Sequence, residues 1–123
     1  NLLRSSDGTK AGIYLNPTSG TLAITVKNCA LYACTHGIYE VGGTVTYDLD
    51  YNGFYGNTWD YTNIDPGDQG ANDVTADPLY TDQANDDYTL QGESPYIDAG
   101  VAVAGINDDY LGDAPDIGRY ETA

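Results

Sequence analysis

Two short segments of the chain alternate apolar and polar residues, and they align with each other when Leu22 is set on Val45. The first is LAITV at 22–26 and the second is VTYDL at 45–49. Alternation with a period of two is typical of β-strands that bury one face. The positions that pair, and that we expect to point inward, are Leu22 with Val45, Ile24 with Tyr47, and Val26 with Leu49.

The same periodicity recurs elsewhere in the first half of the chain. An offset of 23 sets Leu31-Tyr32 on Phe54-Tyr55, and an offset of 25 sets Gly12-Ile13-Tyr14 on Gly37-Ile38-Tyr39. Short strands repeated every 20–25 residues are what a β-solenoid requires, because one coil cannot bury its inward side chains alone. A leucine-rich repeat would need a helical half, and a β-sandwich would need hairpin turns. The sequence therefore predicts an all-β fold of about two to three stacked coils over residues 1–57.

The repeat fades after Asn57. Residues 58–123 are rich in Pro, Gly and Asp, with only brief apolar groups. We expect them to form an irregular C-terminal cap of the same domain that closes the open end of the solenoid. Residues 1–15 show no cap, so we expect the coil beneath them to be missing or to belong to another chain.

The charge excludes two classes of partner. The chain of 123 residues has a net charge of −15 and only four basic residues, which disfavours nucleic acid and anionic membrane surfaces. It has no apolar run long enough to insert into a membrane. Such a surface attracts divalent cations. Cys29 and Cys34 are close in the sequence, and their spacing leaves a disulfide and two buried thiols equally open.

Five phrases in the second half follow one another in a recognisable order. They are Asn63–Asp65 (NID), Asp77–Tyr80 (DPLY), Asp87–Leu90 (DYTL), Ser94–Gly100 (SPYIDAG) and Asp116–Glu121 (DIGRYE). In this order they resemble the C-terminal region of secreted bacterial right-handed parallel β-helix repeat proteins of the pectate-lyase-like superfold. The resemblance implies that fold and a secreted or cell-surface location. Within these phrases we expect Asp98 and Asp116 to accept hydrogen bonds from loop backbone.

The resemblance also implies where chemistry would lie. Lyases of this superfold combine acidic calcium ligands with a Lys or Arg base on an outward strand face. The alignment of the two alternating segments places Lys27 beside Asp50 and Thr25 beside Asp48, so Lys27, Asp48 and Asp50 are the candidate catalytic set. An exposed ion pair is the alternative for these residues. No carboxylate pair stands out for a glycosidase.

A metal site is conceivable in the loop that follows the last strand pattern. Its oxygen side chains and flexible glycines suit Ca²⁺, although they match no EF-hand or nonapeptide calcium repeat, and a solvated turn is the alternative. The candidate ligands are Asp65, Asp68, Asn72 and Asp73. With one His and an isolated Cys pair, zinc is disfavoured.

Trp59 and Tyr61 are the candidate carbohydrate-binding residues, since aromatic rings stack on sugars; covering the core is their alternative role. We expect His36 at a turn. The pairs Tyr14–Tyr39 and Tyr32–Tyr55 are expected to be stacked ladders. We expect Asn28, Asn52 and Asn57 at turns, where Asn tolerates left-handed backbone and forms side-chain ladders.

The sequence favours an extracellular module for carbohydrate contact, adhesion or assembly that is not catalytic in itself. One alternative is part of a calcium-dependent polysaccharide lyase or another polysaccharide-processing enzyme. Another is a self-assembling filament subunit, whose partner at the N-terminal end would be a second copy. These readings share one fold, and the fold does not choose between them.

Overall fold

The computed structural model describes residues 2–4 and 10–122, and these residues form an all-β structure with no α-helix. None of them forms a helix with the length and hydrophobicity needed to span a bilayer. Two short 3₁₀ segments, η1 (Pro66–Asp68) and η2 (Gln83–Asn85), interrupt the strands. The strands are β1 (Leu2–Arg4), β2 (Ala11–Leu15), β3 (Thr21–Lys27), β4 (Ala30–Tyr32), β5 (His36–Glu40), β6 (Thr44–Asp50), β7 (Gly53–Tyr55), β8 (Trp59–Thr62), β9 (Tyr80–Asp82) and β10 (Asp87–Leu90).

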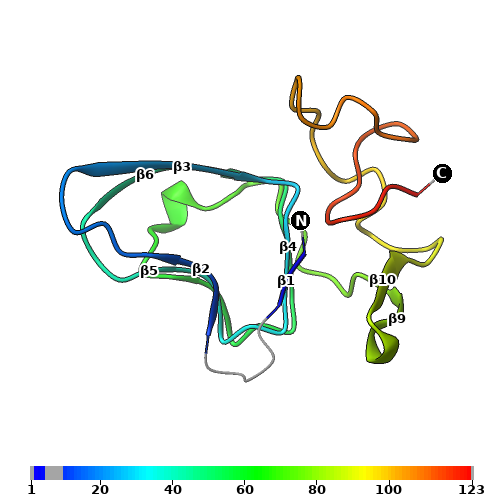
Figure 1. Cartoon of the computed structure of the whole chain (residues 1–123), viewed down its shortest axis with the longest axis horizontal. Helices are drawn as coiled ribbons and strands as arrows, with labels where there is room; N and C mark the ends of the chain where they lie inside the picture. The colour runs from blue at the N-terminus through cyan, green and yellow to red at the C-terminus, as the bar shows by residue number, and fades with distance from the viewer. Residues whose placement is uncertain (1, 5–9, 123) are drawn as a thin grey trace.

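The first eight strands form three parallel sheets, ordered β1-β4-β7, β2-β5-β8 and β3-β6 (Figure 1). Within each sheet, every strand after the first lies on the strand that comes three places before it in the chain. In β3 and β6 the Cα partners are Leu22 with Val45, Ile24 with Tyr47, and Val26 with Leu49. This pairing confirms the register predicted from the alternating pattern. The register is fixed because a slip of one residue would turn every apolar side chain to solvent.

The other predicted pairings are also present. Leu31 lies on Phe54, and Ile13 lies on Ile38. Parallel pairing continues beyond residue 57, because β8 adds to the sheet at β5 with Trp59 opposite His36. The three parallel sheets together thus contain one strand, β8, that the sequence pattern did not indicate.

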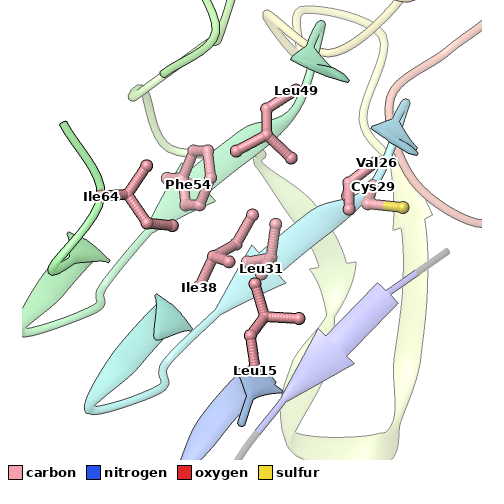
Figure 2. Packing of buried hydrophobic residues seen from close by; sticks show 8 residues of the cluster. All are labelled: Leu15, Val26, Cys29, Leu31, Ile38, Leu49, Phe54 and Ile64. Carbon is pink, nitrogen blue, oxygen red and sulfur yellow. The ribbon is translucent and has the colours of Figure 1, made fainter. Parts of the chain in front are cut away.

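The inward side chains of the three sheets share one core (Figure 2). Fully burying a Leu, Ile or Phe side chain stabilises a fold by about 1.5–3 kcal/mol, so this cluster contributes substantially to stability. Ile24 and Tyr47 pack against it and stay partly exposed. The buried members of the cluster are Leu15, Val26, Cys29, Leu31, Ile38, Leu49, Phe54 and Ile64.

Corners between the sheets use left-handed backbone at equivalent places. Asn28 (φ 55°) and Tyr51 (φ 56°) occupy one corner, and Ala33 (φ 53°) and Gly56 (φ 69°) occupy the next. The left-handed conformation predicted for Asn28 is confirmed. Asn52 is not among the residues with positive φ, and its role is to hydrogen-bond the strand beneath.

Three asparagines tie successive layers together through their side chains. The Nδ2 atoms of Asn52, Asn57 and Asn63 each donate to a main-chain carbonyl oxygen at 2.9 Å. The Oδ1 atoms of Asn52 and Asn57 accept from the main-chain N–H groups of Cys29 and Cys34. The predicted asparagine ladder thus takes the form of bonds between side chain and backbone. The accepting carbonyls belong to Val26, Leu31 and Glu40 respectively.

The C-terminal half covers only part of the open end. Residues 63–74, the closing segment, end on β7, where the N–H of Phe54 donates to the carbonyl of Val74 at 2.8 Å and Gly53 bridges Val74. The rest packs beside the stack (Figure 1), with Tyr96 and Ile117 against Ala30. The expectation that the whole region seals the end was therefore wrong. The small outward residues Ala30 and Gly53 leave a flat flank that large apolar side chains cover.

The flanking region contains the one antiparallel pair among the described residues, β9 with β10. Its loops are held as expected by Asp98 and Asp116. Asp98 Oδ1 accepts from the backbone of Asp113 and Ala114, and Asp116 Oδ2 accepts from Thr122. These bonds replace regular secondary structure in satisfying the backbone.

Candidate functional site

An aromatic strip runs up the outer face of the sheet β2-β5-β8. We use this name for Tyr14, Tyr39, His36 and Trp59. The parallel register places Tyr14 on Tyr39 and His36 on Trp59, so consecutive strands contribute neighbouring rings. His36 opens strand β5, which corrects the expectation that it lies at a turn.

The rings of the strip contact one another closely. His36 stacks on Tyr39 at a centroid distance of 4.5 Å and on Trp59 at 5.1 Å, with interplanar angles of 23° and 15°. Tyr14 meets Tyr39 edge-on at 5.7 Å, so this pair is not the stacked ladder expected, whereas Tyr32 and Tyr55 do stack. Nδ1 of His36 and Oγ1 of Thr62 share a hydrogen bond of 2.7 Å. This bond fixes the imidazole between its two neighbours.

The two ends of the strip are open to solvent. Tyr14 is 58% exposed and Trp59 is 53% exposed. A hollow of about 350 Å³ lies beside the strip, lined by Lys10, Ala11, Tyr14, His36 and Tyr39. Aromatic surface next to hydroxyl and amine groups suits a ligand that carries both an apolar face and hydroxyl groups.

Tyr61, predicted to act together with Trp59, lies elsewhere. It sits above Ile38 and packs on Phe54 at a ring distance of 4.8 Å, inside the stack. Its hydroxyl donates to the carboxylate of Asp73. Burial, followed by that carboxylate, raises the pKa of Tyr61. Tyr61 therefore covers the core, the alternative role considered for it, and Trp59 alone of the pair is on the strip.

Lys27, Asp48 and Asp50 lie together on the outer face of β3 and β6, as the register predicted. Nζ of Lys27 is 2.9 Å from Oδ1 of Asp48, a pair of partly exposed side chains whose contribution to stability is about 1 kcal/mol or less. Asp50 accepts from the backbone N–H and the side-chain amide of Asn72, at 2.8 and 2.9 Å. Burial raises the pKa of Asp50, but the Asn72 hydrogen bonds outweigh it and hold the pKa below its usual value. These contacts anchor the closing segment.

The loop predicted to bind calcium turns its side chains in different directions. Asp73 accepts from the backbone N–H of Asn52 at 2.8 Å as well as from Tyr61, while Asn72 binds Asp50. Asp65 and Asp68 are exposed around η1. Among residues 2–4 and 10–122, no three His, Cys, Asp or Glu side chains gather closely enough to hold a metal ion. The described residues thus lend the predicted site no support.

Both cysteines are buried and free. The thiol of Cys29 donates to the carbonyl of Lys27, and the thiol of Cys34 contacts the carbonyl oxygens of Tyr32 and Leu3. Burial raises the pKa of the Cys29 thiol. Of the two possibilities left open by the spacing, the structure has buried thiols.

Sequence reasoning missed the aromatic strip, although a signal for it was present. The same offset that aligns Leu31 with Phe54 also aligns His36 with Trp59. Applying that offset to His36 would have predicted a strand residue stacked under the tryptophan.

Comparison with known proteins gives no match for this chain. No family model, no curated protein and no solved structure matches it. Any function must therefore be argued from the chain's own residues.

Proposed function

We propose that the chain is part of a right-handed parallel β-helix that is secreted or displayed at a cell surface. Three parallel sheets whose strands recur in the same order along the chain, around one shared core, support this fold. Crossover connections between parallel strands of one sheet are right-handed in about 98% of cases, which supports the hand. The resemblance of the C-terminal phrases supports the location.

The module contacts carbohydrate through the aromatic strip and is not catalytic in itself. The observation that carries this proposal is the half-exposed indole of Trp59, held flat on His36. A ring fixed in this way offers a face for stacking on a sugar at little cost in side-chain entropy. With a net charge of −15, the protein favours neutral polysaccharides over polyuronates.

The test uses the single tryptophan of the chain as its probe. Titration with soluble neutral β-linked polysaccharides should shift and quench the emission of Trp59, while polygalacturonate should have a weaker effect. An emission spectrum that no polysaccharide alters would argue against the proposal.

Two variants separate stacking from a general effect on the fold. Trp59→Ala should weaken binding, measured by calorimetry, at least about tenfold, the range of an interface hot spot, whereas Trp59→Phe should retain part of it. Tyr120→Ala removes an exposed aromatic ring far from the strip in the sequence and should bind like the parent. Equal losses in Trp59→Ala and Tyr120→Ala would count against the strip.

The lyase alternative has weaker support from the same structure. Its candidate base, Lys27, is ion-paired with Asp48, and both carboxylate oxygens of Asp50 are engaged by Asn72. Calcium binding by Asp50 would have to compete with these hydrogen bonds and with the anchoring of the closing segment. The carbohydrate-contact function is therefore the better supported of the two.

A further inference from the structure

The aromatic strip crosses all three strands of its sheet. Tyr14 lies in β2, His36 and Tyr39 lie in β5, and Trp59 lies in β8. Neighbouring strands of a sheet are about 4.8 Å apart, so the backbones of Tyr14 and Trp59 are separated by about 10 Å along the stack. The side chains of the strip stand on the side of the stack, where a further layer would lengthen the strip rather than cover it.

The two exposed ends of the strip are too far apart to share one sugar. Two other rings lie between them, because Tyr39 contacts Tyr14 at a centroid distance of 5.7 Å, and His36 lies 4.5 Å from Tyr39 and 5.1 Å from Trp59. Contact between two rings requires centres about 4.5–7 Å apart. A single sugar can therefore stack at one end only, and a ligand that contacts Tyr14 and Trp59 together must be a chain.

One position of the strip lacks a ring. Ala11, His36 and Trp59 are aligned by the register, one in each layer, so Ala11 is the small residue in a column whose other two members are aromatic. The hollow of about 350 Å³ lies at this position, between Ala11 and three rings of the strip. A volume close to the lower limit of small-molecule sites, about 300 Å³, suits one ring rather than a whole chain. The hollow therefore offers a place for one sugar at β2.

We propose that the strip binds a linear chain of at least three neutral sugars, with one sugar at each of β2, β5 and β8. This inference rests on the proposed carbohydrate-contact function and adds the length and the direction of the ligand. An extended β-linked chain repeats over a length close to the spacing of about 4.8 Å between strands, so successive sugars coincide with successive strands. The sugar at β8 stacks on Trp59, and the sugar at β2 fills the hollow over Ala11 beside Tyr14.

A length series of oligosaccharides tests this arrangement. The probes are β-1,4-linked oligomers of glucose, xylose and mannose, from the monomer to the hexamer, and calorimetry measures their affinity. Affinity should rise at least about tenfold from the monomer to the trimer and change less with each further sugar. A monomer that binds as tightly as the trimer overturns the inference and leaves carbohydrate contact intact. An absence of binding at every length overturns the proposed function as well.

Filling the hollow locates the third sugar. Ala11→Phe places a ring where the column has none, so the trimer should bind about tenfold more weakly while the dimer binds as it does to the parent. Ala23→Phe makes the same change on the exposed outer face of β3 and should bind every oligomer like the parent. Equal affinity of the two variants for the trimer would contradict the position assigned to the sugar at β2.

Tyr14→Ala provides a second test that leaves the hollow unfilled. It removes one exposed end of the strip, so it should weaken binding of the trimer and leave binding of the dimer unchanged, whereas Trp59→Ala should weaken both. If Tyr14→Ala lowered the affinity for dimer and trimer equally, Tyr14 would have a structural role only and the inference would be wrong. Thermal unfolding shows that each variant is folded.

Discussion

The side-chain amide of Asn52 donates to the main-chain carbonyl of Val26, one layer below it in the stack, at 2.9 Å. Asn52 is 0% exposed, and its Oδ1 also accepts from the backbone N–H of Cys29 at 3.1 Å. One side chain therefore satisfies two backbone groups at a buried corner, where water cannot replace it.

Asn52→Ala should consequently destabilise the protein more than most polar substitutions. It leaves a buried N–H and a buried C=O without their partner, and each costs about 1–3 kcal/mol, so we expect a loss of about 2–6 kcal/mol in urea unfolding. Asn85→Ala removes an exposed hydrogen bond to Asp82 and should change stability by about 0.5 kcal/mol or less. Similar losses in the two variants would show that the corner is not a stabilising element.

Gly53→Ala should weaken the packing of the C-terminal region against the stacked sheets and so lower the stability of the protein. A Cβ at Gly53 would overlap the ring of Tyr96, so the substitution should cost about 1–3 kcal/mol, as overpacking typically does. Gly67→Ala meets no atom within 4 Å and should be neutral or slightly stabilising. Thermal denaturation of the two variants compares them directly. Equal stability of Gly53→Ala and Gly67→Ala would contradict the close packing of Tyr96 against Gly53.

Alkaline pH should destabilise the protein steeply. Burial raises the pKa of Tyr80 and Tyr96, so the folded state keeps these hydroxyl protons at a pH where the unfolded chain loses them. Their contribution is complete below the unfolded pKa of about 10 and falls above it by up to about 1.4 kcal/mol per pH unit for each tyrosine. Urea unfolding between pH 8 and pH 11 measures the slope. Tyr96→Phe should flatten it, and a slope that stays as steep in this variant would contradict the assignment.

Asp73 and Asp50 should give opposite responses to acid. Burial raises the pKa of Asp73 despite its hydrogen bonds from Tyr61 and Asn52, so its contribution is largest below the unfolded pKa of about 4 and is lost as the pH rises through the folded value. For Asp50 the bonds from Asn72 prevail over burial and lower the pKa, so its contribution is present above about pH 4 and is lost as the pH falls.

The difference appears in the pH dependence of the two asparagine variants. Relative to the parent, Asp73→Asn should become more stable as the pH rises from about 4 to 7, whereas Asp50→Asn should become less stable as the pH rises from about 3 to 4.5. Chemical denaturation at fixed salt provides the comparison. Responses of the same sign would mean that one of the two pKa shifts has been assigned the wrong direction.

Local sequence patterns were sufficient for the paired strands. Because side chains alternate along a strand, the apolar positions of 22–26 and 45–49 have only one register that buries them all, and that register is present. The neighbouring positions Lys27 and Asp50 then follow without further information. The all-β class follows in the same way from short strand patterns that lack any helical period.

Tertiary packing decided which side chains are exposed and where the C-terminal tail lies. Tyr61 and Trp59 are close neighbours on one strand, yet one covers the core and the other is exposed, because Asp73 and Phe54 are positioned to receive only the first. The placement of the tail depends likewise on Ala30 and Gly53, two small residues whose significance is visible only when Tyr96 and Ile117 lie on them. Contacts of this kind join residues far apart in the chain, so local periodicity cannot predict them.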